Sequence, residues 1–346
     1  MSESRQNMTT TTRATTTMKA IIQEGYGTPE RVLGMQEVDR PPIGDEDVLV
    51  RVRATSVNTP DWITVTGVPY ILRLQSGLRR PKTAVRGTDV AGVVEVVGTK
   101  VTDFKPGDEV FGSAWADRSA TSGTFAEFTV VPASQLVTKP ANVTFEEAAA
   151  SVMSGITALI AMRDVGKVAP GSHVLVNGAS GGVGTLAVQI AKALGAEVTG
   201  VSSTRNLEFV RSLGADHVID YSEEDFTRGE PRYDIILDNV MNHPPSVTAR
   251  ALTPTGTLIP NSIGNSGGLL AGLLRALRAA LLGRGSTNVQ FVKCVVNRGH
   301  LNALAIFLAS GEVKVTIDKT YPLTEAADAV AHMLGHHARG KVAISV

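Results

Sequence analysis

Cysteine is almost absent from this chain of 346 residues, in which Cys294 is the only one. A single cysteine excludes an internal disulfide framework, and it excludes zinc sites built from several cysteines. Such a chain suits a reducing compartment, so we expect a cytoplasmic protein.

The chain also lacks an excess of charge of either sign. Lys plus Arg and Asp plus Glu each number 33. A general nucleic-acid-binding protein would carry a basic excess, so the balance gives no reason to expect DNA or RNA as a partner. Hydrophobic residues make up 43% of the sequence, which at this length is enough for two domains with sizeable cores.

Long apolar runs are missing as well, and we expect no stretch to reach the roughly 18 to 20 apolar residues of a membrane-spanning helix. The nearest candidate is LLAGLLRALRAALL, residues 269–282, in which five leucines share one face at helical spacing. They are Leu270, Leu273, Leu274, Leu277 and Leu281. Docking on a membrane surface is one interpretation. Packing on the domain beside an apolar pocket, or burial in a dimer contact, is the interpretation that we favour.

The first 17 residues are rich in Ser, Thr and Arg and have no apolar core, so they do not form a secretory signal. We expect a disordered leader, with a transit peptide as the alternative. Ordered structure is expected to begin near Met18.

The remaining sequence changes character once along its length. Between Met18 and about Lys139, short β-branched runs separated by turn residues predict a compact antiparallel domain. From about Phe145, strands alternate with helical patterns, which predicts a parallel sheet with helices on both faces. After Asn297 the chain adds further helices and strands, and we expect this tail to return to the first domain.

One short segment predicts a ligand. Residues 174–198 read VLVNGASGGVGTLAVQIAKALGAEV, with small residues between a buried strand and a helix. Small side chains at this point let backbone N–H groups approach a pyrophosphate at the helix N-terminus. The candidate contacts are Ala179, Ser180, Gly181, Gly182, Val183 and Gly184.

The next strand indicates which dinucleotide binds. It ends about 20 residues later, where this kind of fold contacts the adenosine ribose and where an NAD site usually offers Asp or Glu. This chain offers Ser202, Ser203, Thr204, Arg205 and Asn206 instead. Arg205 can form charge-assisted hydrogen bonds with a 2′-phosphate, so the sequence favours NADPH over NADH. The alternative is that Arg205 is a surface residue beside a helix start.

Several long strings in this chain resemble one known family. They are MKAIIQEGYGTPERVL, FKPGDEVFG, NGASGGVGTLAVQIAKALGA, SLGADHVIDY and ARGKVAISV. In this order they are similar to the medium-chain dehydrogenase/reductases, specifically the zinc-independent quinone oxidoreductase branch. The resemblance implies an α/β protein with a GroES-like β-rich catalytic domain (residues 18–142 and 295–346) split around an inserted Rossmann domain of doubly wound parallel sheet (143–294). It also implies NADPH in the cleft between the domains, and a homodimer.

The positions of the family's zinc ligands are altered in this chain. Zinc-using relatives carry a Cys three residues before an Asp, and later a Gly-His-Glu; the matching stretches here read NTPD (58–61) and GTD (87–89). An amide and a hydroxyl cannot replace thiolate and imidazole at a zinc centre, so Asn58 and Thr88 predict no metal. His332 and His336 have the spacing of a helical zinc pair, but Gly335 and the lack of a glutamate after His332 argue against the hydrolase motif.

The chemistry follows from the predicted lack of zinc. Alcohol oxidation in this superfamily needs a Lewis acid, whereas hydride addition to a quinone or an α,β-unsaturated carbonyl needs only a hydrogen-bond donor and a proton. We therefore expect an NADPH-dependent reductase of such a small-molecule electrophile. An enoyl-thioester reductase is an alternative, for which the basic stretch LRLQSGLRRPK (72–82) could bind the substrate's phosphorylated arm. A non-catalytic NADPH-binding redox sensor or scaffold is another.

The resemblance also implies roles for single residues. Asn58 would lie at the nicotinamide ribose or near the substrate oxygen, the alternative being a loop amide that holds the backbone. Apart from the resemblance, Tyr70 is a candidate proton donor or wall of the substrate site, the alternative being a core tyrosine. Asp61 is expected to be structural. Further cofactor contacts implied by the resemblance are Thr157, Tyr221, Asn239, Ser262, Ile263 and Lys341.

Overall fold

The computed structural model describes residues 16–70, 73–115, 123–228, 230, 232–262, 271–285, 287–335 and 338–346. The first strand, β1 (Thr17–Gln23), pairs antiparallel with β2 (Leu33–Asp39). Residues 1–15 of the predicted leader lie outside the described part of the chain, so its disorder stays a prediction.

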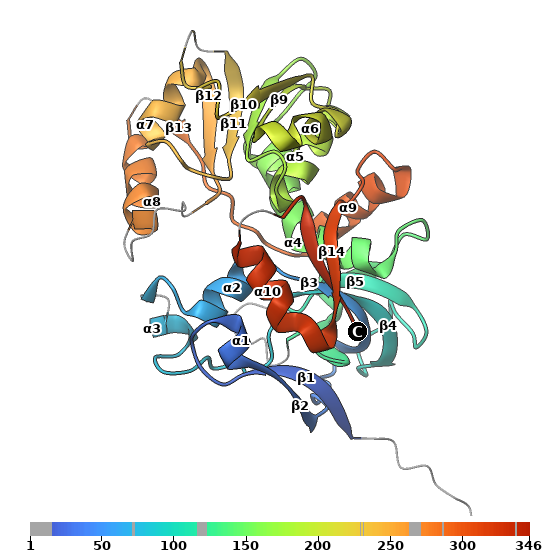
Figure 1. Cartoon of the computed structure of the whole chain (residues 1–346). Helices are drawn as coiled ribbons and strands as arrows, with labels where there is room; N and C mark the ends of the chain where they lie inside the picture. The colour runs from blue at the N-terminus through green and yellow to red at the C-terminus, as the bar shows by residue number, and fades with distance from the viewer. Residues whose placement is uncertain are drawn as a thin grey trace, which may run out of the picture.

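Seven strands form an antiparallel-rich sheet in the lower part of Figure 1. Their order is β14-β15-β3-β4-β5-β7, and β6 also pairs with β3. The strands are β3 (Asp47–Ser56), β4 (Asp89–Val97), β5 (Glu109–Ser113), β6 (Phe128–Pro132), β7 (Leu136–Thr138), β14 (Ile317–Pro322) and β15 (Lys341–Ser345). In β3, buried Val50 and Val52 alternate with exposed Arg51 and Arg53, as in a strand with one face on a core. Because β15 pairs with β3, the end of the chain lies against the N-terminal strands, as the sequence predicted.

A second sheet of six strands is entirely parallel and lies in the upper part of Figure 1. Its order is β10-β9-β8-β11-β12-β13, which is the 3-2-1-4-5-6 order of a dinucleotide-binding sheet. The strands are β8 (His173–Asn177), β9 (Glu197–Ser202), β10 (His217–Asp220), β11 (Tyr233–Asp238), β12 (Leu252–Pro260) and β13 (Asn288–Val289). The predicted fold class is therefore confirmed. All six strands fall within residues 143–294, which supports these boundaries as our proposal for the Rossmann domain.

Helices cover the two sheets and connect their strands. Those of the catalytic part and the connections are α1 (Pro29–Val32), α2 (Thr59–Thr66), α3 (Arg73–Ser76), α9 (Arg298–Ser310) and α10 (Ala326–Leu334). Those of the parallel-sheet part include α5 (Gly182–Ala193), α6 (Leu207–Ser212), α7 (Pro245–Thr248) and α8 (Ala271–Leu282). Short 3-10 turns are η2 (Ala133–Gln135), η4 (Thr204–Asn206), η5 (Ala249–Ala251) and η6 (Leu323–Glu325).

The helix α4 (Phe145–Leu159) continues into a π-helical turn, η3 (Ile160–Val165), and joins the two parts. Thr144 caps it by accepting a hydrogen bond from the Glu147 N–H at 3.1 Å. The prediction that no stretch reaches membrane-spanning length was wrong, because the helical segment Phe145–Val165 is long and apolar enough by composition. Its most apolar window is 78% buried in the protein, and α4 contacts α5, β3 and β4. It is therefore a core helix, apolar because α5 and the antiparallel-rich sheet pack on it.

The leucines of α8 do not pack as expected. Leu274, Leu277 and Leu281 are each about half exposed, whereas Ala279 is fully buried. The helix contacts α7 and β13, and Ala279 is a side chain through which it packs on the protein. Leu270 and the side chain of Leu273 lie outside the described part of the structure. Packing of this leucine face on its own domain was a wrong expectation for the three described leucines, and its burial in a dimer stays a prediction.

Candidate active site

The glycine turn between β8 and α5 leaves room for a ligand beside its backbone. A Cβ atom on Gly184 would lie 2.1 Å from the Gly178 carbonyl oxygen, so the turn closes this tightly only with glycine at position 184. Gly178 has a φ of +76°, in the left-handed region that glycine adopts without strain. Gly181 is the N-cap of α5 and has no side chain to cover the first N–H groups of the helix. These donors and the helix dipole favour an anion at this point.

The start of β15 lies against this turn. The Gly340 N–H donates to the Ser180 carbonyl oxygen at 2.9 Å. A Cβ on Gly182 would lie 2.9 Å from Lys341 Cδ and 3.4 Å from the hydroxyl oxygen of Ser154 on α4. Three segments distant in sequence thus meet at the turn: the glycine loop, the start of the last strand and the middle of α4. Thr157, buried on α4, lies less than one turn beyond Ser154.

Lys341 and Asn58 form a buried hydrogen-bonded pair beside this junction. Lys341 Nζ donates to Asn58 Oδ1 at 2.5 Å and to the Val57 carbonyl oxygen at 3.1 Å. Asn58 Nδ2 donates to Asp89 Oδ2 at 2.7 Å and to Thr88 Oγ1 at 3.2 Å. Because an ammonium group only donates and a carboxylate oxygen accepts, this pattern fixes the orientation of the amide.

The fixed amide limits what Asn58 can offer a ligand. Both of its Nδ2 hydrogens are used within the protein, and only a lone pair on Oδ1 remains. The side chain can accept a hydrogen bond from a ribose hydroxyl, but it has no N–H left to donate to a substrate oxygen. The geometry therefore favours the ribose position over the substrate position for Asn58.

Three further buried ionisable groups, Asp61, Asp89 and Arg86, lie near this pair. Burial raises the pKa of Asp61 to about 7, although the Asn58 N–H donates to its carboxylate at 2.8 Å. Burial also raises the pKa of Asp89, against the attraction of Lys341, and burial lowers the pKa of Lys341 and of Arg86. Shifts of this kind mark functional sites. Sequence analysis missed Asp89 and Arg86, although GTD stands where zinc-using relatives have Gly-His-Glu.

One oxygen of Asp89 carries the polar contacts of its carboxylate. Asp89 Oδ2 accepts from Ser56 Oγ at 2.9 Å and from the Met153 N–H at 3.4 Å, besides Asn58. Asp89 Oδ1 is buried without a hydrogen-bond partner. Burial raises the pKa of Asp89, whereas the nearby ammonium group of Lys341 and the hydrogen bonds to Oδ2 favour its ionised form.

Asn58 and Thr88, which stand where zinc-using relatives have metal ligands, form contacts with other groups of the protein. Asn58 and Thr88 bond each other, and the ammonium group of Lys341 lies against Asn58, where it would repel a cation. Within the described ranges no group of three or more His, Cys, Asp or Glu is arranged to hold a metal. His332 interacts with Tyr321 and Asp318, while His336 lies outside the described residues.

The residues predicted for the adenosine end gather at the carboxyl ends of β8, β9 and β10. Asn206 Nδ2 donates to Ser180 Oγ at 3.2 Å and to Ser203 Oγ at 3.3 Å. The Tyr221 N–H donates to the carbonyl oxygen of Ser202, and the Tyr221 side chain is exposed. Arg205 is exposed in the turn η4.

A second arginine at this end was missed in the sequence. Arg339 Nε donates to Asn206 Oδ1 at 3.2 Å, and its guanidinium lies 5.1 Å from the ring centre of Phe209. The signal was present, because Arg339 stands two residues before Lys341 in the string ARGK. Arg339 and Arg205 thus place two cationic side chains near the end of β9.

Asn239 and Ser262 follow β11 and β12 at the same edge of the sheet. Asn239 Nδ2 donates to the Asn177 carbonyl oxygen at 3.2 Å, and its Oδ1 accepts from Asn261 Nδ2 at 2.7 Å. Asn239 therefore ties three strand ends together. Ile263 lies outside the described part of the chain.

Tyr70 is not joined to the Asn58 cluster by the contacts described. Its half-exposed ring lies 4.4 Å from the guanidinium of Arg73, which also lies 4.3 Å from the ring centre of Tyr26. Arg73 Nε donates to the carbonyl oxygen of Gly67 at the end of α2. Within the basic stretch 72–82, Arg73 is thus held by protein contacts, whereas Arg79, Arg80 and Lys82 are exposed.

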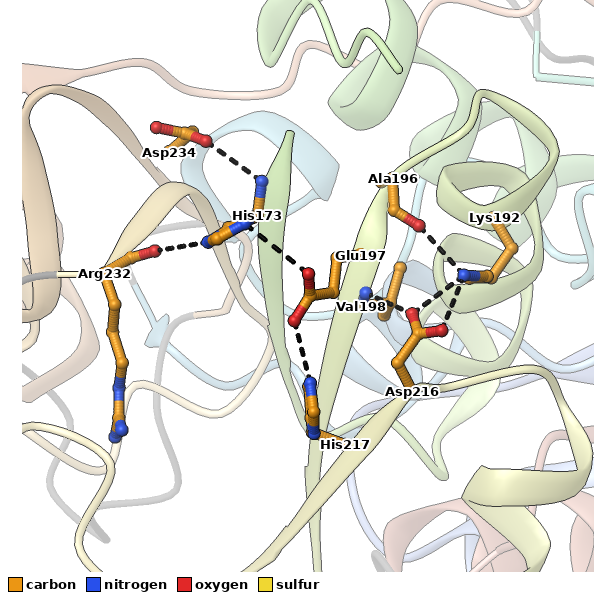
Figure 2. Close-up of polar contacts among 9 residues, drawn as sticks. All are labelled: His173, Lys192, Ala196, Glu197, Val198, Asp216, His217, Arg232 and Asp234. Atoms are coloured by element: carbon orange, nitrogen blue, oxygen red, sulfur yellow. Dashed lines mark hydrogen bonds and ion pairs between the residues drawn. The ribbon is translucent and has the colours of Figure 1, made fainter. Parts of the chain in front are cut away.

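Figure 2 shows polar contacts at the opposite edge of the parallel sheet, where its strands begin. His173 and His217 flank the carboxylate of Glu197, at 3.5 and 2.8 Å. Lys192 pairs with Asp216 at 2.8 Å. Ligands bind at the carboxyl ends of such strands, so we assign these contacts to joining strands and helices rather than to the active site.

Comparison with known proteins identifies the family. Residues 44–141 match the alcohol dehydrogenase GroES-like domain, and residues 213–344 match the zinc-binding dehydrogenase family. The chain is 31% identical to the chloroplastic quinone-oxidoreductase QR1 of Triphysaria versicolor, over 94% of this chain and 98% of that protein. It is 31% identical to the mitochondrial NAD(P)H oxidoreductase RTN4IP1 of Mus musculus, over 98% and 92%.

A solved structure agrees with these matches. The quinone oxidoreductase from Coxiella burnetii superposes with a TM-score of 0.81 at 27% identity, covering 95% of this chain and 99% of that one. Fold, glycine turn and relatives together give one assignment. The chain belongs to the medium-chain dehydrogenase/reductase superfamily, in its zinc-independent, quinone-oxidoreductase-like branch, and is an oxidoreductase with a nicotinamide cofactor and a small-molecule substrate.

Proposed function

We propose that this oxidoreductase transfers hydride from NADPH to a quinone or an α,β-unsaturated carbonyl without a metal ion. The observation that carries the proposal is the Lys341–Asn58 pair, in which an ammonium-bonded amide takes the place of a zinc ligand. Without a Lewis acid, an alkoxide is poorly stabilised, whereas the charge that develops on a reduced quinone or enone is delocalised.

The residues present fit the cofactor. The bare turn Ala179–Gly184 and the first N–H groups of α5 would hold the pyrophosphate, because the turn closes tightly only with glycine at position 184 and the N-cap Gly181 has no side chain to cover those N–H groups. Arg205, with Arg339 and the hydroxyls of Ser202 and Ser203, would bind the 2′-phosphate. When bound, the nicotinamide supplies the hydride.

The other end of the cleft would hold the nicotinamide. Asn58 Oδ1 would accept a ribose hydroxyl, and Lys341 would keep the amide in that orientation. Thr157 on α4, Asn239 after β11, and Ser262 with Ile263 after β12 are proposed to contact the ring and its amide. These residues orient the cofactor, and the substrate's oxygen takes its proton from water or from Tyr70.

Arg205→Ala is expected to weaken NADPH binding by about 1.5 to 3 kcal/mol, the scale of a hydrogen bond to a charged group, and to leave NADH binding nearly unchanged. Fluorescence titration with both cofactors measures this. Arg211→Ala is the matched control, since Arg211 is an exposed arginine on α6 paired with Glu208. Equal losses for NADPH and NADH would contradict the phosphate role.

The purified chain is expected to oxidise NADPH steadily with quinones or enones, and a metal chelator should leave the rate unchanged. The rate is followed by NADPH absorbance across a panel of acceptors, with and without the chelator. Tight NADPH binding with no turnover would instead indicate a sensor. Inhibition by the chelator that added zinc reverses would overturn the metal-free assignment.

Assembly and location remain proposals. We propose a homodimer, for which the two-residue outer strand β13 leaves an open edge on the parallel sheet. The cytoplasmic location predicted from the single cysteine stays a prediction, since the relatives named above are chloroplastic and mitochondrial proteins.

A further inference from the structure

The helix α8 turns an apolar row toward solvent. Leu274, Leu277 and Leu281 are 50%, 55% and 51% exposed and follow one another at helical spacing. The opposite side is fixed to the protein, with Ala279 fully buried and Arg275 Nη1 donating to the Met241 carbonyl oxygen at 2.5 Å. The orientation of the leucines is therefore set by contacts on the far side of the helix.

The charge of this region is of one sign. Arg278 is exposed between the leucines, and Arg284 is exposed just after the helix. No aspartate or glutamate occurs anywhere between Asp238 and Glu312, although the chain as a whole has equal numbers of acidic and basic residues. We call Leu274, Leu277, Arg278, Leu281 and Arg284 the α8 surface.

We propose that the α8 surface docks on an anionic lipid bilayer. Leucines on one face of a helix enter the boundary between headgroups and acyl chains, and neighbouring arginines are attracted to anionic headgroups. In Figure 1, α8 lies at the left edge of the upper part of the molecule. The missing acidic residues remove the repulsion that a negative leaflet would otherwise exert on this part of the chain.

The charge of the α8 surface favours an anionic bilayer over a second copy of the chain as its binding partner. A two-fold contact through the α8 surface would bring Arg278 and Arg284 of both copies together with no acid from the same region to neutralise them. Half-exposed leucines would gain from either contact, but only an anionic surface also complements the arginines. The inference goes beyond the proposed reductase activity and does not depend on it.

Co-sedimentation of the full chain with lipid vesicles tests the proposal. Binding is expected to vesicles of phosphatidylcholine with phosphatidylglycerol, to weaken with added salt, and to be much weaker with phosphatidylcholine alone. The double variant Leu277→Glu, Leu281→Glu should bind the anionic vesicles at least about tenfold more weakly. Ile306→Glu is the matched control, since Ile306 is an apolar residue 67% exposed on α9, and its binding should be unchanged.

Three results would overturn the proposal. The first is that the unaltered chain does not bind anionic vesicles, and the second is that the double variant binds them as tightly as the unaltered chain. The third is that light scattering shows a smaller oligomer for the double variant while the unaltered chain does not bind vesicles. NADPH titration of the same samples reports on the cofactor site separately. Loss of reductase activity with vesicle binding intact would therefore concern the proposed function alone.

Discussion

Replacing Lys341 by methionine is expected to lower the free energy of unfolding by about 3 to 5 kcal/mol at neutral pH, the scale of the cost of leaving a buried charge without its compensating partner. The Lys341 side chain is fully buried and donates to the Val57 carbonyl oxygen and Asn58 Oδ1. Methionine keeps the apolar stem but leaves both acceptors without this donor and the carboxylate of Asp89 without its cation. Urea unfolding followed by circular dichroism measures the change.

A double-mutant cycle separates the electrostatic coupling of Lys341 and Asp89, which both bond to Asn58, from general packing. Asp89→Asn alone removes one of the two carboxylates that attract the buried ammonium group, the other being Asp61, whereas Lys341→Met with Asp89→Asn removes both the ammonium group and the Asp89 carboxylate. The double variant should therefore cost at least about 1 kcal/mol less than the sum of the single variants. Strictly additive costs would show that the two side chains act independently.

A second lysine provides the control for function. Lys139 is also buried, and its ammonium group donates to the Val143 carbonyl oxygen at 2.7 Å, away from the glycine turn. Lys139→Met should lower stability but leave KM for NADPH unchanged under conditions where the protein is folded. Lys341→Met should raise that KM, because Asn58 Oδ1 loses the donor that orients its amide. If both variants changed KM for NADPH to a similar extent, the proposed role of Lys341 in positioning Asn58 would be contradicted.

How much of the fold and of the site could be predicted depends on how far apart in the sequence the residues of each feature lie. The glycine turn lies in one contiguous stretch, so its strand, turn and helix could be predicted from local pattern, and the structure has them as β8 and α5. The Lys341–Asn58 hydrogen bond joins residues 283 positions apart. The resemblance placed Lys341 and Asn58 near the cofactor. The hydrogen bonds that use both amide hydrogens of Asn58 follow only from the packing of the folded chain.

The α8 helix shows what a helical pattern leaves open. Its leucines predicted an apolar face, which the structure has, but not the direction in which that face points. Direction is set by the neighbours, here the contacts that bury Ala279 and the bond from Arg275 to Met241. For the same reason the contact of the Arg73 guanidinium with the rings of Tyr26 and Tyr70 could not be predicted from the sequence.

Asp61→Asn is expected to stabilise the protein above neutral pH and to have little effect near pH 4. The pKa of Asp61 is raised by burial from its ordinary 3.8 to about 7, so the folded state binds a proton more readily than the unfolded state. The stability contributed by the protonated carboxyl is complete below about pH 4 and is lost as the pH rises toward about 7. At one pKa unit per 1.36 kcal/mol, the loss reaches at most about 4 kcal/mol.

Asparagine removes this dependence and keeps the local bond, since its side-chain oxygen can still accept from the Asn58 N–H. The difference in unfolding free energy between Asp61→Asn and the unaltered chain should therefore grow from about pH 4 to about pH 7 and then level off. Asp108→Asn is the control with the opposite sign, because hydrogen bonds from Lys105 lower the pKa of Asp108. A difference that stays flat between these pH values would mean that Asp61 is ionised throughout, with buried Arg86 compensating its charge. In that case removing the charge of Arg86 should restore the pH dependence.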